Sequence, residues 1–265
     1  MPTTYTHDLF GKQVYQKLPK EIKQVIRQNG NLFRIGLHGP DILFYYFISK
    51  NPVTQFGVNM HKEKARAFFE QGMQRVRETE DEKLLAYLLG FGCHYLLDST
   101  CHPFVNEMEQ ARVISHTVLE KEMDRTLMLD TGKDPYSYRP SDCIVARYSY
   151  ARTIHQAMPL VKTGNIFLSL KMMKYFTNKL VCDDGGKRRE FFGKIASVFG
   201  EKSSISLMEF FMMKKPCPGS EVPVARLKNL YKKALLEAPK ELCDLFELSL
   251  REGHLSSRWD RNYNG

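Results

Sequence analysis

The sequence predicts an all-α fold of about ten helices, arranged as one multi-helical domain over residues 1–265. Apolar residues recur at spacings of three and four along the whole chain, which is the periodicity of amphipathic helices. Strand-like alternation of apolar and polar residues is scarce, and helix-breaking residues separate the periodic stretches. Because no repeat or Pro/Ser-rich linker divides the chain, we expect a single body.

The individual helices follow from this periodicity in chain order. Five are expected at 20–28, 31–48, 61–77, 82–101 and 110–129, and five more at 142–157, 164–180, 187–199, 203–213 and 221–252. The predicted breaks lie at Gly30-Asn31, Asn51-Pro52, Pro103, Thr131-Gly132 with Pro135, and Asp183-Asp184-Gly185-Gly186. Proline lacks a backbone N–H and glycine is conformationally permissive, so each of these positions favours the end of a helix.

Composition excludes several classes of protein. With 43% hydrophobic and 12% aromatic residues, the chain can bury a core, which excludes intrinsic disorder. No stretch reaches the roughly 18 apolar residues of a spanning helix, and the first residues do not resemble a signal peptide. The six cysteines form no CxxC pair, so we expect reduced thiols rather than a zinc knuckle. A cytoplasmic location is the resulting expectation.

Charge is unevenly distributed along the chain. Residues 1–130 carry 16 basic and 16 acidic side chains, whereas residues 131–265 carry 23 and 14, so the whole net charge of +9 arises in the second half. Such a surface attracts anions, and phosphate-bearing partners such as a lipid surface, nucleic acid or a small phosphoester are one interpretation. A basic surface that only keeps the protein in solution is the other.

The clearest chemical signal is a stripe of possible metal ligands in 82–101 and just beyond it. His94, Asp98 and His102 follow one another at intervals of four residues, so on a helix they share one face. The surrounding segment is otherwise apolar, where an unpaired carboxylate would be costly to bury. A second pair of this kind, His116 and Glu120, follows at the same spacing, and Asp124 lies one turn further.

Each of these histidines taken alone has a simpler interpretation, as a hydrogen-bonded core residue or as half of a local salt bridge. Two adjacent helices with the same His-x-x-x-acid pattern favour a metal, because imidazole nitrogens and carboxylate oxygens are the ligands that zinc prefers. Further ligand types occur at His7, at Asp41 in a turn restricted by Pro40, and at His61, which is expected to open a helix.

The ordered set His7, Gly39-Pro40-Asp41, His61, His94-x-x-x-Asp98-x-x-x-His102 and His116-x-x-x-Glu120 resembles the zinc-dependent phospholipase C family. That family includes bacterial phospholipases C and the catalytic domain of clostridial alpha-toxin, and it shares its helical fold with fungal single-strand nucleases. The resemblance covers roughly residues 5–130. The spacing of Asp98 and His102 is shorter than in the best-known secreted members and is similar to that of glycosylphosphatidylinositol-specific phospholipase D.

The resemblance implies a cluster of two or three Zn²⁺ ions. One ion would be held by Asp41, His61, His94 and Asp98, with Asp41 also acting as a base toward water, and another by His102, His116 and Glu120. Asp98 would bridge to a third ion, shared with His7 and the amino terminus. Secreted members commonly begin with a tryptophan that binds this third ion, whereas this chain begins Met1-Pro2-Thr3. Paired metal ions suit phosphodiester cleavage because they lower the pKa of bound water and stabilise charge on the phosphoryl oxygens.

Residues that contact the substrate are less clearly marked. His38 is a candidate, although it can equally be a core or surface residue, and Tyr136 and Tyr138 are candidates for stacking on a base or a choline head group. The Met- and Phe-rich stretch 207–215 is either an interfacial lip or ordinary core.

Three functions are therefore weighed from the sequence. The first is a zinc-dependent phosphodiester hydrolase of phospholipase C type that acts on a phospholipid and contacts an anionic membrane surface peripherally. The second is a single-strand nuclease or nucleotidase on the same scaffold, although the single Trp259 offers few platforms for base stacking. The third is a non-catalytic, metal-stabilised module that binds anionic surfaces.

Overall fold

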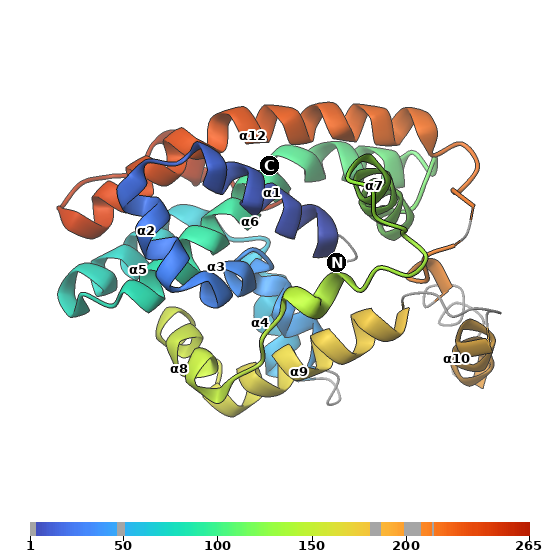
Figure 1. The fold of residues 1–265 in the computed structure, drawn as a ribbon, viewed down its shortest axis with the longest axis horizontal. Coiled ribbons are helices and arrows are strands. Elements are labelled where there is room, and N and C mark those ends of the chain that lie inside the picture. The colour runs from blue at the N-terminus through green and yellow to red at the C-terminus, as the bar shows by residue number, and fades with distance from the viewer. Residues whose placement is uncertain (1–3, 47–50, 181–186, 199–207, 214) are drawn as a thin grey trace. The chain divides into compact units, whose positions relative to one another are not determined.

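The computed structural model describes residues 4–46, 51–180, 187–198, 208–213 and 215–265. These residues form helices and irregular connections but no strand, which confirms the all-α prediction (Figure 1). Eleven α-helices and three short 3₁₀-helices occur within the described ranges. None of these helices has both the length and the apolar character needed to cross a bilayer.

The α-helices are, in chain order, α1 (Thr4–Lys17), α2 (Lys20–Gln28), α3 (Gly30–Gly36), α4 (Pro52–Met60), α5 (Ala65–Thr79), α6 (Glu82–Gln110), α7 (His116–Asp130), α8 (Tyr148–Ala157), α9 (Thr163–Leu180), α10 (Lys187–Val198) and α12 (Glu221–Leu250). The 3₁₀-helices are η1 (Gly39–Tyr45), η2 (Pro140–Cys143) and η3 (Ser257–Asp260). The prediction for 20–28 matches α2. Of the helix predicted at 203–213, residues 203–207 lie outside the described residues, and the prediction is wrong for 210–213, which are not helical.

The helix predicted at 31–48 is wrong as one continuous element. Helix α3 ends at Gly36, and the chain continues into the 3₁₀-helix η1. Gly39 adopts a positive φ of 47°, and Pro40 follows it without a backbone N–H, so the α-helical hydrogen-bond ladder cannot pass through this point. The turn that carries Asp41 is therefore built by its own glycine and proline, and it lies buried.

Two helices begin at other residues than predicted, because the N-cap residues Asn51 and Ser115 determine where they start. Asn51 accepts a hydrogen bond from the backbone N–H of Thr54 at 2.8 Å and begins α4, so His61 follows the end of that helix instead of opening the next one. In the same way, the hydroxyl of Ser115 accepts from Val118 N at 3.3 Å, and α7 begins at His116 rather than at residue 110.

The predicted break at Pro103 is also wrong, because α6 continues through it to Gln110. A proline inside a helix costs about 3 kcal/mol. This helix is buried almost all round between Leu84 and Ser99, so the packing of its side chains outweighs that cost. The hydroxyls of Ser99 and Thr100 bond to carbonyls one turn earlier, a pattern that often accompanies a bend in a helix.

The chain forms two compact units. One contains residues 7–103, 143–173 and 230–265, and the other contains residues 104–142, 174–229 and the start of α1. The prediction of one domain over 1–265 stays a prediction.

The core of the first unit forms around the middle of α6. Gly90 on α6 and Gly36 on α3 bring the two backbones together so closely that a Cβ at Gly90 would lie 2.1 Å from the carbonyl oxygen of Phe33. An aromatic cluster packs beside this crossing, with Trp259 4.6 Å from Phe69 and 5.1 Å from Tyr95 between ring centroids. This packing fixes the face of α6 that carries His94 and Asp98.

The cysteines that the structure describes are free thiols, three of them buried and two partly exposed; the sixth, Cys182, lies outside the described residues. The prediction of unpaired thiols is confirmed for these five.

Candidate metal centre

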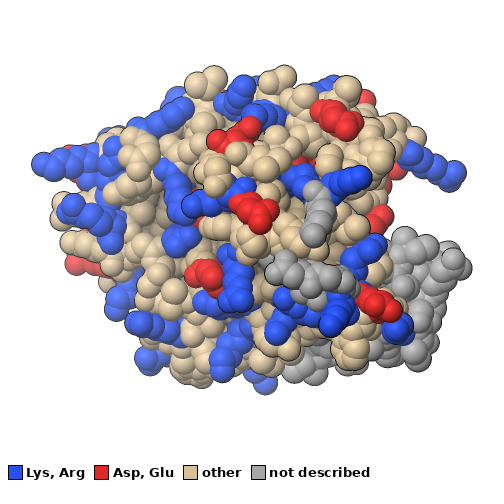
Figure 2. Space-filling model, turned by 45° about the vertical axis from the view of Figure 1, so that its right-hand side comes forward, with Lys and Arg blue, Asp and Glu red and all other residues tan. Residues whose placement is uncertain are grey.

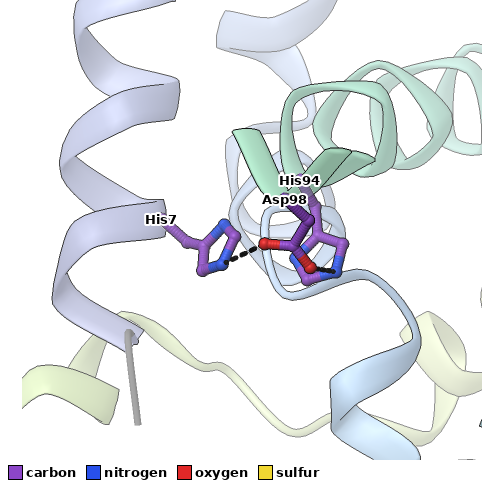
Figure 3. A group of neighbouring side chains, drawn as sticks. All are labelled: His7, His94 and Asp98. Atoms are coloured by element: carbon purple, nitrogen blue, oxygen red, sulfur yellow. Dashed lines mark ion pairs between the residues drawn. The ribbon is translucent and has the colours of Figure 1, made fainter. Parts of the chain in front are cut away.

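Asp98 lies at the centre of a group of histidines in the first unit. Its Oδ1 is 3.2 Å from Nε2 of His7 on α1, and its Oδ2 is 3.0 Å from Nε2 of His94, one turn earlier on α6 (Figure 3). Nε2 of His102, one turn later, lies 3.7 Å from Oδ1. The stripe predicted from the spacing of four residues therefore exists, and His7 joins it from a different helix.

The surroundings of Asp98 favour its ionised form. Burial alone would raise the pKa of this carboxyl group, but the imidazoles of His102, His94 and His7 outweigh burial and hold its pKa well below the usual range. A buried carboxylate that stays charged at neutral pH is the form that binds a divalent metal ion.

A second pair lies next to this group in the same unit. Nε2 of His61 is 3.1 Å from Oδ1 of the buried Asp41, and Nδ1 of His61 is 2.8 Å from the carbonyl oxygen of Gly57. A carbonyl only accepts hydrogen bonds, so Nδ1 carries the proton and donates it there. Protonated His61 also donates from Nε2 to Asp41, whereas in the neutral form that binds a metal ion the lone pair is on this same Nε2.

Asp41 and His61 each change the pKa of the other. Burial would raise the pKa of Asp41, but the hydrogen bond with His61 contributes to keeping it lowered. Burial would lower the pKa of His61, and the same hydrogen bond with Asp41 raises it. Asp41 therefore remains a carboxylate at neutral pH.

His94 joins the two groups. The possible ligand atoms of His7, His94 and Asp98 lie within 4.8 Å of one another, and so do those of Asp41, His61 and His94. Four ligands at 2.0–2.2 Å around tetrahedral zinc are about 3.3–3.6 Å apart, so small side-chain movements suffice to bind an ion. Nδ1 of His94 and Nδ1 of His7 are buried without a hydrogen-bond partner, a costly state for a polar atom. A metal ion bound within the group would replace the contacts between the Nε2 atoms and Asp98. The residues present fit a zinc site.

The third predicted group consists of His102, His116 and Glu120, and only His116 and Glu120 lie in the same unit. Nε2 of His116 lies 3.1 Å from Oε1 of Glu120 on α7, and the pKa of His116 is raised because the charge of Glu120 stabilises its protonated form. His102 belongs to the other unit, so the zinc site predicted for these three residues stays a prediction.

The three candidate substrate contacts lie in different settings. His38 is 2% exposed, its Nε2 lies 3.7 Å from Sγ of Cys143, and burial lowers its pKa to about 3, so it is a neutral side chain within the core. Tyr136 and Tyr138 are half-buried in the turn region after α7, and Tyr138 packs edge-on against Tyr5 with centroids 5.2 Å apart. Their contact with a substrate stays a prediction.

Tyr263 is a site residue that sequence reasoning missed. Its ring lies 5.1 Å from His61 and 5.9 Å from His94 between centroids, and its backbone N–H donates to the carbonyl of His61 at 3.3 Å. Its hydroxyl is buried without a hydrogen-bond partner. No spacing rule links a tyrosine so late in the chain to the histidines of its first half, so no local signal marked it.

The residues gathered here fall within a recognised sequence family. A family model described as zinc dependent phospholipase C matches residues 6–164, which is more than half of the chain. The chain belongs to the zinc-dependent phospholipase C family. A search of curated proteins finds no match, and a search of solved structures finds none either.

Membership of the zinc-dependent phospholipase C family agrees with the donor groups described above, since each of them lies inside the matched range. The family's metal is zinc, and its substrates are, at the coarse level of the name, phospholipids. Tyr263, α10 and α12 lie beyond the matched residues.

Proposed function

We propose that this protein is a zinc-dependent hydrolase that cleaves a phospholipid between its glycerol oxygen and the phosphate, releasing the phosphorylated head group. The observation that carries this proposal is that His94 is shared between two donor groups. Together they contain the buried Asp41, His7 and Asp98 and the partly exposed His61. Two ions bound so close together suit attack on a phosphodiester better than a single structural ion would.

The proposed ligands follow the donor groups. Asp41, His61, His94 and Asp98 would hold one zinc ion, and Asp98 and His7 would hold a neighbouring one. His102, His116 and Glu120 are proposed for a further ion, by family resemblance. When bound, zinc supplies a water of lowered pKa and stabilises the negative charge that develops on the phosphoryl oxygens.

The side chains have separate roles in this proposal. Asp41 accepts the proton of the attacking water, for which it must be ionised, and its lowered pKa supports that state. His61 keeps Asp41 in place through the 3.1 Å contact, and Gly57 in turn fixes the orientation of the His61 ring. The buried surroundings strengthen each of these electrostatic interactions.

The distribution of surface charge supports an anionic substrate. On the face drawn in Figure 2, Lys and Arg side chains are spread widely and acidic side chains are few, in agreement with the net charge of +9. A basic face attracts anionic lipids and raises the rate of encounter with them. Peripheral contact with an anionic membrane is accordingly part of the proposal.

The proposal is tested by measuring release of phosphorylated head group from phospholipid vesicles by the zinc-loaded protein. Asp41→Asn is expected to lower kcat by at least about a hundred-fold, since general-base catalysis contributes about 10²–10⁴-fold. Asp244→Asn, which changes a half-exposed carboxylate on α12, is the matched control and is expected to retain activity. Hydrolysis of single-stranded oligonucleotides or nucleotides without lipid hydrolysis would instead establish the nuclease alternative. Full zinc loading without any hydrolysis would establish a non-catalytic binding module.

A further inference from the structure

The second unit contains a cavity that the proposed function does not use. Its volume is about 760 Å³, within the range of about 300–1,000 Å³ that small-molecule sites occupy. One wall comes from α7, where Val118, Lys121 and Glu122 share a face at spacings of three and four residues. The opposite wall comes from residues beyond the family match, namely Arg189 on α10, Met208, Glu209, Met213, Lys215, Pro216, Cys217 and Pro218.

The walls of this cavity are mainly apolar. Val118, Met208, Met213 and Pro216 are among the residues that line it. Methionine side chains are flexible and polarisable, so they adapt to apolar ligands of irregular shape. These walls favour a ligand with a hydrocarbon part over a fully polar one such as inorganic phosphate.

Two cations at the cavity are unpaired within the described residues. Lys121 is 5% exposed, yet no hydrogen bond or ion pair joins its ammonium group to a described residue. Burial lowers the pKa of Lys121, and the negative charge of Glu122, which acts in the opposite direction, does not outweigh burial. Arg189 likewise has a buried Nε without a hydrogen-bond partner. Charged groups with buried atoms are normally paired, so the buried Lys121 and the buried Nε of the partly exposed Arg189 beside one cavity indicate that an anion belongs there.

The carboxylates of the cavity do not cancel these cations. Nε of Arg125 lies 3.1 Å from Oε2 of Glu122, and both side chains are buried, so they neutralise each other. Glu209 also lines the cavity, as does a third cation, Lys215. The remaining side chains carry three positive charges against one negative charge, and this balance favours an anionic ligand over a cationic one.

We infer that this cavity binds an anionic amphiphile, with its acyl or alkyl chain against the methionine- and proline-lined wall and its carboxylate or phosphate head beside Lys121 and Arg189. The inference does not rest on the proposed function, because no residue of the metal centre lines the cavity.

The inference is tested by calorimetric titration of the full chain with defined amphiphiles below their micelle concentrations. Dodecyl phosphate or laurate is expected to bind at least about ten-fold more tightly than dodecyltrimethylammonium, since a hydrogen bond to a charged group contributes about 1.5–3 kcal/mol. Binding of both anions indicates a site for any anionic head. Binding of dodecyl phosphate alone indicates a phosphate head, and binding of laurate alone a fatty acid. Equal binding of the cationic amphiphile would overturn the inference.

Substitutions locate the binding at this cavity. Lys121→Met and Arg189→Met keep an apolar stem and are each expected to weaken binding about ten-fold, whereas Lys232→Met, at an exposed position on α12, is the matched control. Lys121→Met removes an unpaired buried charge, so it is expected to fold at least as stably as the parent protein, which a thermal melt checks. Unchanged affinity in both cavity variants would show that the amphiphile binds elsewhere.

Cys217 provides an independent readout without any substitution. It lines the cavity and is a partly exposed free thiol, so bound dodecyl phosphate is expected to slow its alkylation by iodoacetamide. Cys243 on α12, also partly exposed and away from the lining, is the internal reference in the same peptide mass spectra. Equal labelling of Cys217 with and without the amphiphile would contradict occupancy of this cavity.

Discussion

The ring of Tyr263 lies 5.1 Å from the imidazole of His61 between centroids, and its backbone N–H bonds to the carbonyl of the same residue. The side-chain amide of Asn264 donates to that carbonyl as well, at 3.3 Å. Residues 255–265 thus hold His61 in place from outside the part of the chain that matches the family. Because His61 directs Asp41, this late segment supports the candidate metal centre.

We therefore predict that the ring of Tyr263, rather than its hydroxyl, is needed for zinc binding. Tyr263→Ala is expected to destabilise the protein by about 3–5 kcal/mol, as for other large aromatic side chains in cores, and to lower zinc content. Tyr263→Phe removes only a hydroxyl without a hydrogen-bond partner, so stability is expected to change by less than about 1 kcal/mol. Urea denaturation and elemental analysis measure both effects. Loss of zinc in the Phe variant would show that the hydroxyl itself serves the site.

Asp98 is expected to be the most sensitive single ligand, since its two oxygens face His7, His94 and His102. Asp98→Asn removes the negative charge and replaces one carboxylate oxygen with an amide NH₂ group, which cannot bind zinc. Its zinc affinity is expected to fall by at least about a hundred-fold, beyond the 10–100-fold typical of supporting residues. Competition with a chromophoric chelator measures the affinity, with Asp244→Asn as control. An Asn variant with parental zinc content would remove Asp98 from the ligand set.

The sequence predicts the helical class and the stripe on α6 because both depend on local spacing. His94, Asp98 and His102 share a face in any helix, so their proximity follows from the spacing of four residues. The first helix, α1, was not predicted, because its capping interaction comes from Asp124, far along the chain. The contact of Tyr263 with His61 is likewise a product of tertiary packing, which no periodicity reveals.

Asp124 itself continues the stripe of His116 and Glu120, but the structure gives it a structural role. Its carboxylate accepts hydrogen bonds from the backbone N–H groups of Tyr5 and Thr6, at 3.3 and 2.8 Å, and from the hydroxyl of Thr6. These N–H groups belong to the first turn of α1, where no intrahelical acceptor exists. The carboxylate also lies favourably toward the positive end of the helix dipole.

Asp124→Ala is accordingly expected to destabilise the protein by about 2–4 kcal/mol, because three donors lose one buried acceptor. Asp130→Ala, on the same helix, removes only an exposed ion pair with Lys228 and is expected to cost less than about 1 kcal/mol. Chemical denaturation of both variants measures the difference. Equal stability of the two variants would contradict the capping role, and an unchanged zinc content in Asp124→Ala would separate this role from ligation.

Gly39 offers the sharpest test of how the Asp41 turn is built. It has a φ of 47°, and a Cβ at this position would lie 2.2 Å from Cδ2 of His94, a possible ligand in both groups. Gly132 also has a positive φ, of 70°, but a Cβ there meets only open space, so Gly132→Ala isolates the backbone cost of about 1–2 kcal/mol.

Gly39→Ala has the same backbone cost and must also displace the His94 ring, for which overpacking adds about 1–3 kcal/mol. We expect Gly39→Ala to be less stable than Gly132→Ala by that second amount and, unlike the control, to bind less zinc. Thermal denaturation and elemental analysis compare the two proteins. If both variants lost the same stability and kept full zinc content, His94 would not depend on the close approach of Gly39, and the turn would be required only for its φ.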